Sequence, residues 1–140
     1  MSKETVNTRW MNKMAFEAEV SGHKILLDAG PSVGGENRGP RPKPLMLAAL
    51  GACTGMDVIS ILKKMRVDVG SFNIKVEGDL TEEQPIHFYR MHVCYEFTGK
   101  DLPMEKLKKA VALSEERYCG VSAVYKKALE LTSEIKVTES

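Results

Sequence analysis

The sequence carries almost no net charge, because 20 basic residues are balanced by 19 acidic ones and the formal charge is +1 at pH 7. No run of basic residues is longer than two. A chain without a basic patch or tail lacks the electrostatic field that attracts nucleic acid or an anionic membrane surface. We therefore expect neither nucleic acid nor a membrane among its partners.

Cysteine is also scarce, with three residues in 140 and no Cys-x-x-Cys motif. An odd number of cysteines does not pair off into a disulfide scaffold. The first residues, MSKETVNTRWMNKM, lack the apolar core of a secretory signal, so we expect a cytoplasmic protein whose thiols stay reduced. These absences point to packing, metal or redox roles for the cysteines.

Internal repeats and low-complexity segments are absent, and 140 residues fit one domain, so we expect a single domain over residues 1–140. The one long apolar segment, residues 44–62, has the length of a membrane span. Asp57 lies two-thirds of the way along it. A carboxylate there fits a helix buried inside protein, where polar partners are available.

The hydrophobic pattern predicts an α+β fold. Alternating residues predict short strands between residues 7 and 27, a hairpin of residues 72–80 and 88–98, and a closing strand at 133–137. Helical spacing predicts helices at 102–118 and 121–130, whereas glycine and proline predict an extended loop at 30–42. Since this order does not alternate βαβα, we expect an antiparallel sheet packed against a long central apolar helix and two further helices.

The central helix is expected to start at Pro44 and to end in the cations Lys63, Lys64 and Arg66. Apolar residues occupy every side of residues 45–62, so the helix has no wet face. A chain of this size does not surround such a helix easily. We therefore expect a homodimer in which central helices pack together.

Two cysteines are candidates for redox chemistry. Cys53 lies in the central helix among small residues, in LGACTGMD, which leaves room for a molecule to approach its sulfur. Apolar surroundings would raise its pKa, so reactivity requires a nearby cation or hydrogen-bond donor, and an inert packing role is the equal alternative. Cys119 ends the second helix. If the fold brings them together, they can act as a peroxidatic and a resolving cysteine.

Cys94 and His92 share the polar face of the second hairpin strand, which invites a metal interpretation. Because the chain has only three histidines and no second ligand pair, an exposed or interface cysteine is the stronger interpretation, and we expect no metal and no cofactor. His23, His87 or His92 could serve Cys53 as a base. Solvated surface histidines are the stronger interpretation for all three.

Two stretches carry a family resemblance: GPRPKPLMLAALGACTGMDVISILKKMR, and DLPMEKLKKAVALSEERYCGVS after the hairpin. The first is a proline-initiated apolar helix with a small-Ala-Cys motif, and the second has the form Leu-Ser-x-x-x-Tyr-Cys-x-Val. In sequence and separation they resemble the signature regions of the OsmC/Ohr family, named for osmotically inducible protein C and organic hydroperoxide resistance. The segments GPRP, ALGACT and LSEERYC are closer to its less characterised OsmC-like branch.

The resemblance implies an intertwined homodimer, with two sheets wrapping the central helices and active sites at the subunit interface. It also implies an antioxidant, stress-response peroxidase that reduces organic hydroperoxides. Cys53 would attack the peroxide and become a sulfenic acid, Cys119 would resolve it as a disulfide, and a dithiol reductant would restore both thiols. The alternative is a non-catalytic dimer that senses redox state or binds an apolar ligand.

One position departs from the family pattern. The family has an acidic residue ten positions before the first cysteine, which helps to hold an arginine against the thiolate, whereas this chain has Lys43 there. Arg38, in the preceding loop, is our candidate substrate-binding cation, and Lys43 itself could lower a thiol pKa. A solvated surface charge is the alternative for Arg38.

Overall fold

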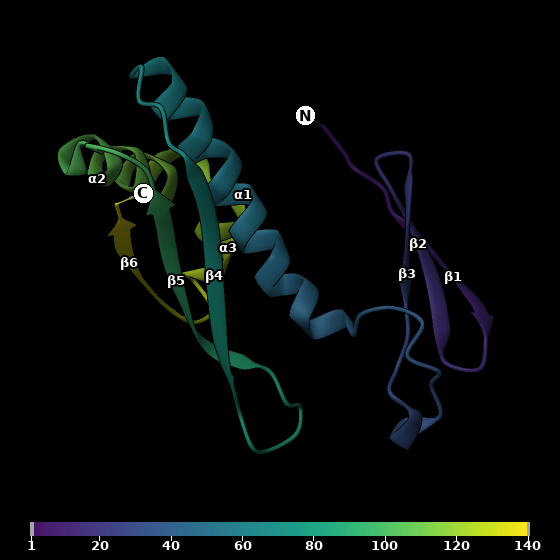
Figure 1. The fold of residues 1–140 in the computed structure, drawn as a ribbon. Coiled ribbons are helices and arrows are strands. Elements are labelled where there is room, and N and C mark those ends of the chain that lie inside the picture. The colour runs from purple at the N-terminus through teal and green to yellow at the C-terminus, as the bar shows by residue number, and fades with distance from the viewer. Residues whose placement is uncertain (1, 140) are drawn as a thin grey trace. The chain divides into compact units, whose positions relative to one another are not determined.

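The computed structural model describes residues 2–139, and the chain forms two compact units that divide after Met46. Each unit contains a three-stranded sheet, and the helices belong mainly to the second unit (Figure 1). The predicted α+β class is confirmed, with two sheets in place of one. That both units form one domain stays a prediction.

The first unit is an antiparallel meander of β1 (Asn7–Asn12), β2 (Ala15–Val20) and β3 (His23–Leu27). Ser21 and Gly22, at the β2–β3 turn, both have positive φ angles, of 51° and 79°. Two successive positive φ angles are the geometry that a tight two-residue hairpin requires, and glycine adopts it at little cost. The strands predicted between residues 7 and 27 are confirmed.

The loop after β3 is organised around the buried carboxylate of Asp28. It accepts hydrogen bonds from the backbone N–H groups of Ala29 (2.7 Å), Glu36 (3.1 Å) and Arg38 (3.1 Å), and from Nε of Arg38 (3.3 Å). Burial acts to raise the pKa of Asp28, but these hydrogen bonds lower it to about 2. The glycine- and proline-rich loop is therefore held in one arrangement by one carboxylate.

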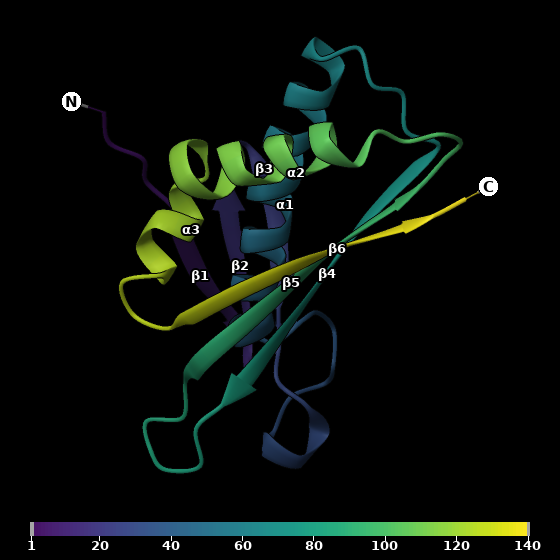
Figure 2. The ribbon, with the colours of Figure 1, turned by 90° about the vertical axis from the view of Figure 1, so that its left-hand side faces the viewer.

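The second sheet contains β4 (Ser71–Leu80), β5 (Phe88–Thr98) and β6 (Glu130–Thr138), in the order β4-β5-β6. The β4–β5 hairpin is antiparallel, as predicted, but β6 runs parallel to β5 (Figure 2). The expectation of a purely antiparallel sheet is wrong for this pair. The chain crosses over through helices after β5, and such a crossover returns the next strand in the same direction.

The loop before α1 contains a short 3-10 turn, η1 (Pro31–Val33), within the segment predicted to be extended. The other helices are α1 (Pro42–Lys64), α2 (Met104–Leu113), a single π-helical turn η2 (Ser114–Tyr118) and α3 (Gly120–Tyr125). α1 starts two residues before the predicted Pro44, and α3 is shorter than predicted because β6 already begins at Glu130. The helices cover one face of the second sheet (Figures 1 and 2). The core between them includes Leu50, Val58, Leu62, Met91, Val93, Tyr95, Phe97, Leu107, Ala110 and Val111.

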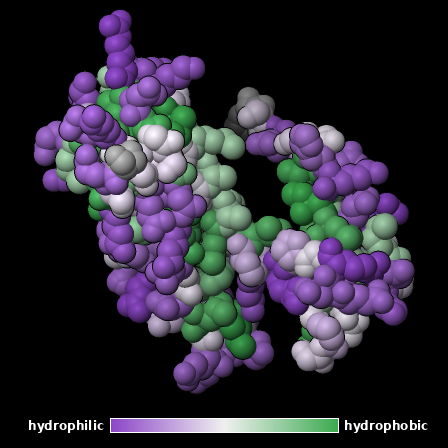
Figure 3. Space-filling model, viewed as in Figure 1, coloured by the Kyte–Doolittle hydropathy of each residue, from purple (hydrophilic) through white to green (hydrophobic). Residues whose placement is uncertain are grey.

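α1 presents two different faces. One face is buried in the core of the second unit and consists of four residues spaced four apart: Leu50, Thr54, Val58 and Leu62. On the other side lies an exposed row, which we call the α1 stripe; its members are Ala48, Ala49, Ala52, Met56 and Ile59. Figure 3 shows a hydrophobic band along this helix. By length and composition α1 could also cross a membrane.

Candidate active site

Cys53 and Cys119 lie together in the second unit. Cys53, on α1, is half-buried and packs against the core cluster, to which Cys119 belongs with 3 % of its surface exposed. The side chain of Cys119 lies close enough to the Cys53 thiol to affect its ionisation, and both cysteines are free. The sequence left open whether these side chains meet, and the fold brings them into contact.

The chain segment around Cys119 holds both sulfur atoms. The N–H of Cys119 donates to the carbonyl of Ser114 at 2.8 Å, which closes the π-helical turn. The N–H of Ser122 then donates to Sγ of Cys119 at 3.4 Å, and the N–H of Val121 lies beside the sulfur of Cys53. Two consecutive amides therefore contact the two thiols. Single π-helical turns occur frequently at functional sites.

The surroundings of Cys53 disfavour its ionised form. Burial raises the pKa of the Cys53 thiol, the N–H of Val121 lowers it, and the neighbouring Cys119 and the Asp57 carboxylate raise it further. The net direction is upward from the ordinary value. None of these groups is positively charged. A reactive Cys53 thus requires a cation in addition to them.

Replacing Asp57 by asparagine is expected to lower the pKa of Cys53, because the nearby negative charge disappears while an acceptor for Ser114 remains. Since the thiolate is the nucleophile, alkylation of Cys53 by iodoacetamide should be faster at pH 7–8 and its pH profile should move to lower pH. Peptide mapping measures this rate. Asp68→Asn, at an exposed position, is the control. An unshifted profile would contradict the assigned role of Asp57.

A chain of buried hydroxyls lies beneath the two cysteines. Oγ1 of Thr54 is 2.7 Å from Oγ of Ser114 and 2.9 Å from the hydroxyl of Tyr95. Ser114 donates to Asp57 at 2.9 Å, and Tyr95 donates to Glu115 at 2.8 Å. We call these five residues the hydroxyl chain. Because Ser114 and Tyr95 use their protons on carboxylates, Thr54 can donate its one hydroxyl proton to either of them, and it joins the two halves of the chain.

The hydroxyl chain was not predicted from the sequence. Thr54 is separated from Tyr95 by 41 positions and from Ser114 by 60. Neither a periodicity nor a motif links residues that far apart. The only available signal was polarity: Thr54 and Ser114 stand at positions of a helical pattern that otherwise call for apolar side chains, and buried hydroxyls need partners.

Residues 34–134 match the family described as OsmC-like protein. The chain belongs to this family. A relative, protein YhfA of Escherichia coli (strain K12), is 35% identical over 130 residues, which cover 92% of this chain and 94% of YhfA. The resemblance seen in the two cysteine motifs is therefore confirmed, including its assignment to the OsmC-like branch.

Solved structures share the fold of this OsmC-like chain. A hypothetical protein from Aquifex aeolicus VF5 superposes with a TM-score of 0.87 at 29% identity, over 100% of this chain and 99% of that one. The organic hydroperoxide resistance protein OhrB of Bacillus subtilis superposes with a TM-score of 0.67 over 94% and 96% of the chains, respectively. At 18% identity, the likeness to OhrB shows the fold alone.

Arg38 of this OsmC-like protein is held within the first unit. Its Nε lies 3.3 Å from the buried carboxylate of Asp28, and its Nη2 donates to Oδ1 of Asn12 at 2.6 Å. Lys43, which replaces the family's acidic residue, is exposed near the start of α1. A carboxylate that orients an arginine is therefore present, but it comes from the end of β3. The substrate-binding role of Arg38 stays a prediction.

Cys94 lies on the outer face of the second sheet, away from the helices. Of the two expected settings, exposed or at an interface, the exposed one is wrong, because only 3 % of Cys94 is accessible in the single chain, and the interface setting stays a prediction. Its cross-strand neighbours are Lys75 and Glu134, whose long side chains can cover a small thiol. Burial raises the pKa of Cys94, and the charge of Glu134 raises it further. Cys94 is thus poorly suited to redox chemistry.

His92 lies on this outer face and has partners there. Its Nε2 is 2.6 Å from Oε2 of Glu134, and its Nδ1 is 2.7 Å from Oγ1 of Thr132. His92 is not placed to act as a base for Cys53, because its side chain points away from the helical face of the sheet. Within residues 2–139, the His, Cys, Asp and Glu side chains form no cluster of three or more that could hold a metal ion.

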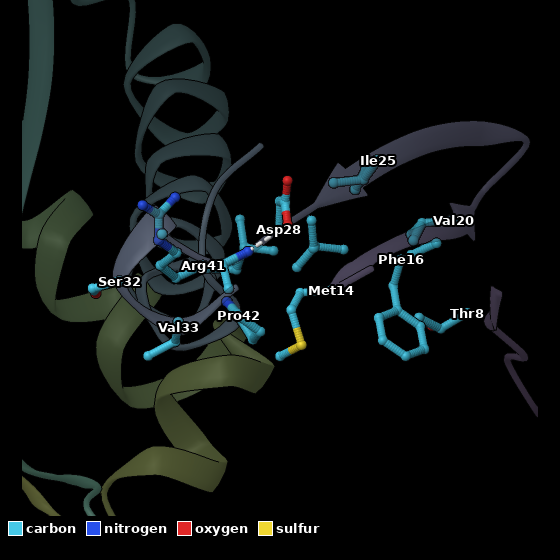
Figure 4. Close-up of a pocket in the computed structure, with 15 residues that line it drawn as sticks. Thr8, Met14, Phe16, Val20, Ile25, Asp28, Ser32, Val33, Arg41 and Pro42 are labelled. Atoms are coloured by element: carbon cyan, nitrogen blue, oxygen red, sulfur yellow. Dashed lines mark hydrogen bonds between the residues drawn. The ribbon is translucent and has the colours of Figure 1, made fainter. Parts of the chain in front are cut away.

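The first unit contains an apolar pocket of about 860 Å³ that the sequence analysis missed (Figure 4). Its apolar lining includes Met14, Phe16, Ala18, Val20, Ile25 and Leu27. Asp28 and Arg41 contribute polar atoms, and Arg41 donates to Oδ1 of Asn37 at 2.7 Å. One face of the first sheet is therefore hydrophobic and uncovered within this unit.

Proposed function

We propose that this OsmC-like protein is a cytoplasmic thiol-dependent peroxidase that reduces organic hydroperoxides in a redox stress response. The observation that carries the proposal is the contact between the Cys53 and Cys119 thiols, each beside a backbone amide. A pair of thiols in contact can pass between the dithiol and disulfide states without rearrangement of the fold. The structural similarity to the Bacillus subtilis organic hydroperoxide resistance protein OhrB is consistent with the same class.

The proposed reaction has three steps. The Cys53 thiolate attacks the terminal peroxide oxygen, the O–O bond breaks, and the departing alkoxide takes up a proton to become an alcohol. The Cys119 thiolate then attacks the sulfur of the Cys53 sulfenic acid, so that a disulfide forms and hydroxide leaves as water after protonation. An external dithiol reduces the disulfide by thiol–disulfide exchange.

We propose that apolar side chains along α1 favour an alkyl peroxide over hydrogen peroxide. Leu47, Gly51 and Ala52 line a shallow groove beside α1, and Met56 lines the next one along the helix. Leu50, by contrast, faces the core and is fully buried. An apolar groove stabilises the alkyl part of a substrate by removing it from water.

We propose Arg38 as the substrate-binding cation, because its guanidinium is oriented by Asp28 and Asn12. If Arg38 holds the peroxide, Arg38→Lys should raise KM while the alkylation rate of Cys53 stays unchanged. If it stabilises the thiolate, alkylation should slow as well. Unchanged kinetics in both assays would show that Arg38 neither binds the substrate nor stabilises the thiolate.

A homodimer is the second part of the proposal. The α1 stripe and the apolar pocket of the first unit are both uncovered in a single chain, and Met56 is 73 % exposed. Large exposed apolar patches in soluble proteins mark interaction surfaces. In a two-fold dimer each subunit carries both patches, so the partner subunit can cover the α1 stripe and the apolar pocket.

The direct test of the function is peroxide consumption. Purified protein is given cumene hydroperoxide and a dithiol such as dihydrolipoamide, with Cys53→Ser as the blank and hydrogen peroxide as the competing substrate. We expect sustained consumption of cumene hydroperoxide and slower consumption of hydrogen peroxide. No consumption above the blank would reject the peroxidase. A stable disulfide without turnover would then favour a redox sensor, and unmodified thiols would favour binding of an apolar ligand.

A further inference from the structure

The hydroxyl chain connects the residue after Cys53 to the backbone of Cys119. Thr54, Ser114 and Tyr95 are fully buried, so water does not compete for their hydrogen bonds. Thr54 contacts Ser114 at 2.7 Å through the side chains, and the Ser114 carbonyl accepts from the N–H of Cys119 at 2.8 Å. Two hydrogen bonds therefore join the α1 segment of one cysteine to the segment of the other.

We propose that Thr54 and Ser114 are positioning residues that hold Cys119 against Cys53 for disulfide formation. This inference rests on the proposed function and adds a role that the cysteine motifs do not show. The π-helical turn that precedes Cys119 begins at Ser114, whose hydroxyl is tied to Thr54 and Asp57. The beginning of the turn is thus anchored to α1.

A second anchor fixes the next residue of the turn. The side chain of Glu115 accepts hydrogen bonds from Tyr95 at 2.8 Å and from Ser133 at 3.3 Å, and its carbonyl accepts one from Nζ of Lys126 at 2.8 Å. Thr54 links this anchor to the first one, because it contacts both Tyr95 and Ser114. Loss of the Thr54 hydroxyl should loosen the turn relative to α1 while each half keeps its carboxylate.

The step that depends on this geometry is the attack of the Cys119 sulfur on the Cys53 sulfur. The S–S bond forms in line with the S–O bond that breaks, and the departing hydroxide becomes water. Misplacement of a reacting group by about 1 Å can slow a reaction by about a hundredfold. The first step, attack of Cys53 on the peroxide, does not use Cys119 and should keep its rate.

The test is Thr54→Val, which keeps the shape of the side chain and removes its hydroxyl, together with Ser114→Ala. Rapid mixing with cumene hydroperoxide followed by quenching and mass analysis separates the sulfenic acid from the disulfide. We expect sulfenic acid formation within about twofold of wild type and disulfide formation slowed at least about tenfold, with more sulfinic acid. Equal disulfide rates in wild type and both variants would overturn the proposal.

Two controls separate positioning from general destabilisation. Phe97→Leu removes a buried ring of the same strand as Tyr95, in stacking contact with Phe72 at 4.4 Å, without touching a hydroxyl. It should lower thermal stability and leave the ratio of the two rates unchanged. If Phe97→Leu, at matched loss of stability, slows disulfide formation as much as Thr54→Val does, the role of Thr54 is structural and the proposal is wrong.

A second readout does not depend on peroxide chemistry. In a glutathione redox buffer, the disulfide fraction gives the effective concentration of the Cys119 thiol at Cys53. We expect this effective concentration to fall at least about tenfold in Thr54→Val. An unchanged value contradicts the inference even if the protein is a peroxidase. A fall in this value in a protein that consumes no peroxide rejects the proposed function and supports the positioning role.

Discussion

Replacing Cys119 by serine is expected to let the protein reduce about one equivalent of cumene hydroperoxide per chain and then stop. Cys53 can still attack the peroxide, because its own sulfur is unchanged and the backbone amide of Val121 remains beside it. The sulfenic acid that forms then has no thiol in contact with it. Cys94 cannot take over, because it is buried on the outer face of the sheet.

The stalled protein can be followed directly by mass analysis. Dimedone should trap the Cys53 sulfenic acid in Cys119→Ser, and excess peroxide should drive that residue to the sulfinic acid. Cys94→Ser is the matched control and should turn over like wild type. Sustained turnover of Cys119→Ser at the wild-type rate would contradict the assigned resolving role, since it would require another thiol to complete the cycle.

Replacing Met56 by aspartate is expected to dissociate the dimer. Met56 is 73 % exposed in the single chain, so the change should leave the folded chain intact. In a dimer that buries the α1 stripe, two-fold symmetry would place the new carboxylate in the interface twice. An unpaired buried charge is strongly unfavourable, and we expect dimer affinity to fall by at least about a hundredfold.

Sedimentation velocity over a range of protein concentrations measures this effect. Leu80→Asp, which places the same charge at an exposed apolar residue outside the α1 stripe, is the control and should remain dimeric. If the active site lies at the subunit interface, as the family resemblance implies, the Met56 variant should also lose peroxide turnover. Wild-type protein that is monomeric at micromolar concentration, or a Met56→Asp variant that remains dimeric, would contradict the proposed interface.

The sequence could predict the elements because their patterns are local. Alternation along β4 identified the face that contacts the helices, and the prolines before α1 located its start to within two residues. The direction of β6 could not be predicted, since the closing strand has the same alternation whether it pairs parallel or antiparallel. The burial of Cys94 depends on its register with Lys75 and Glu134, which lie on other strands.

The residues of the candidate site were also predictable only where the signal was local in the sequence. Cys53 and Cys119 were identified by the motifs around them, which are continuous in sequence. The bonds of Thr54 to Tyr95 and Ser114 depend on tertiary packing, so the sequence analysis could not identify them. The carboxylate partner of Arg38 was missed for a related reason: Asp28 lies at the end of β3, ten residues before it, and no regular spacing relates the two.

The proposed redox pair of Cys53 and Cys119 can be tested directly with a limiting amount of peroxide. Reduced protein is treated with one equivalent of cumene hydroperoxide without added dithiol, its remaining thiols are alkylated, and it is analysed by intact mass and peptide mapping. We expect a loss of about two mass units on oxidation, a cross-link between the Cys53 and Cys119 peptides, and one alkylated cysteine, Cys94. Three alkylated cysteines with no cross-link would contradict it.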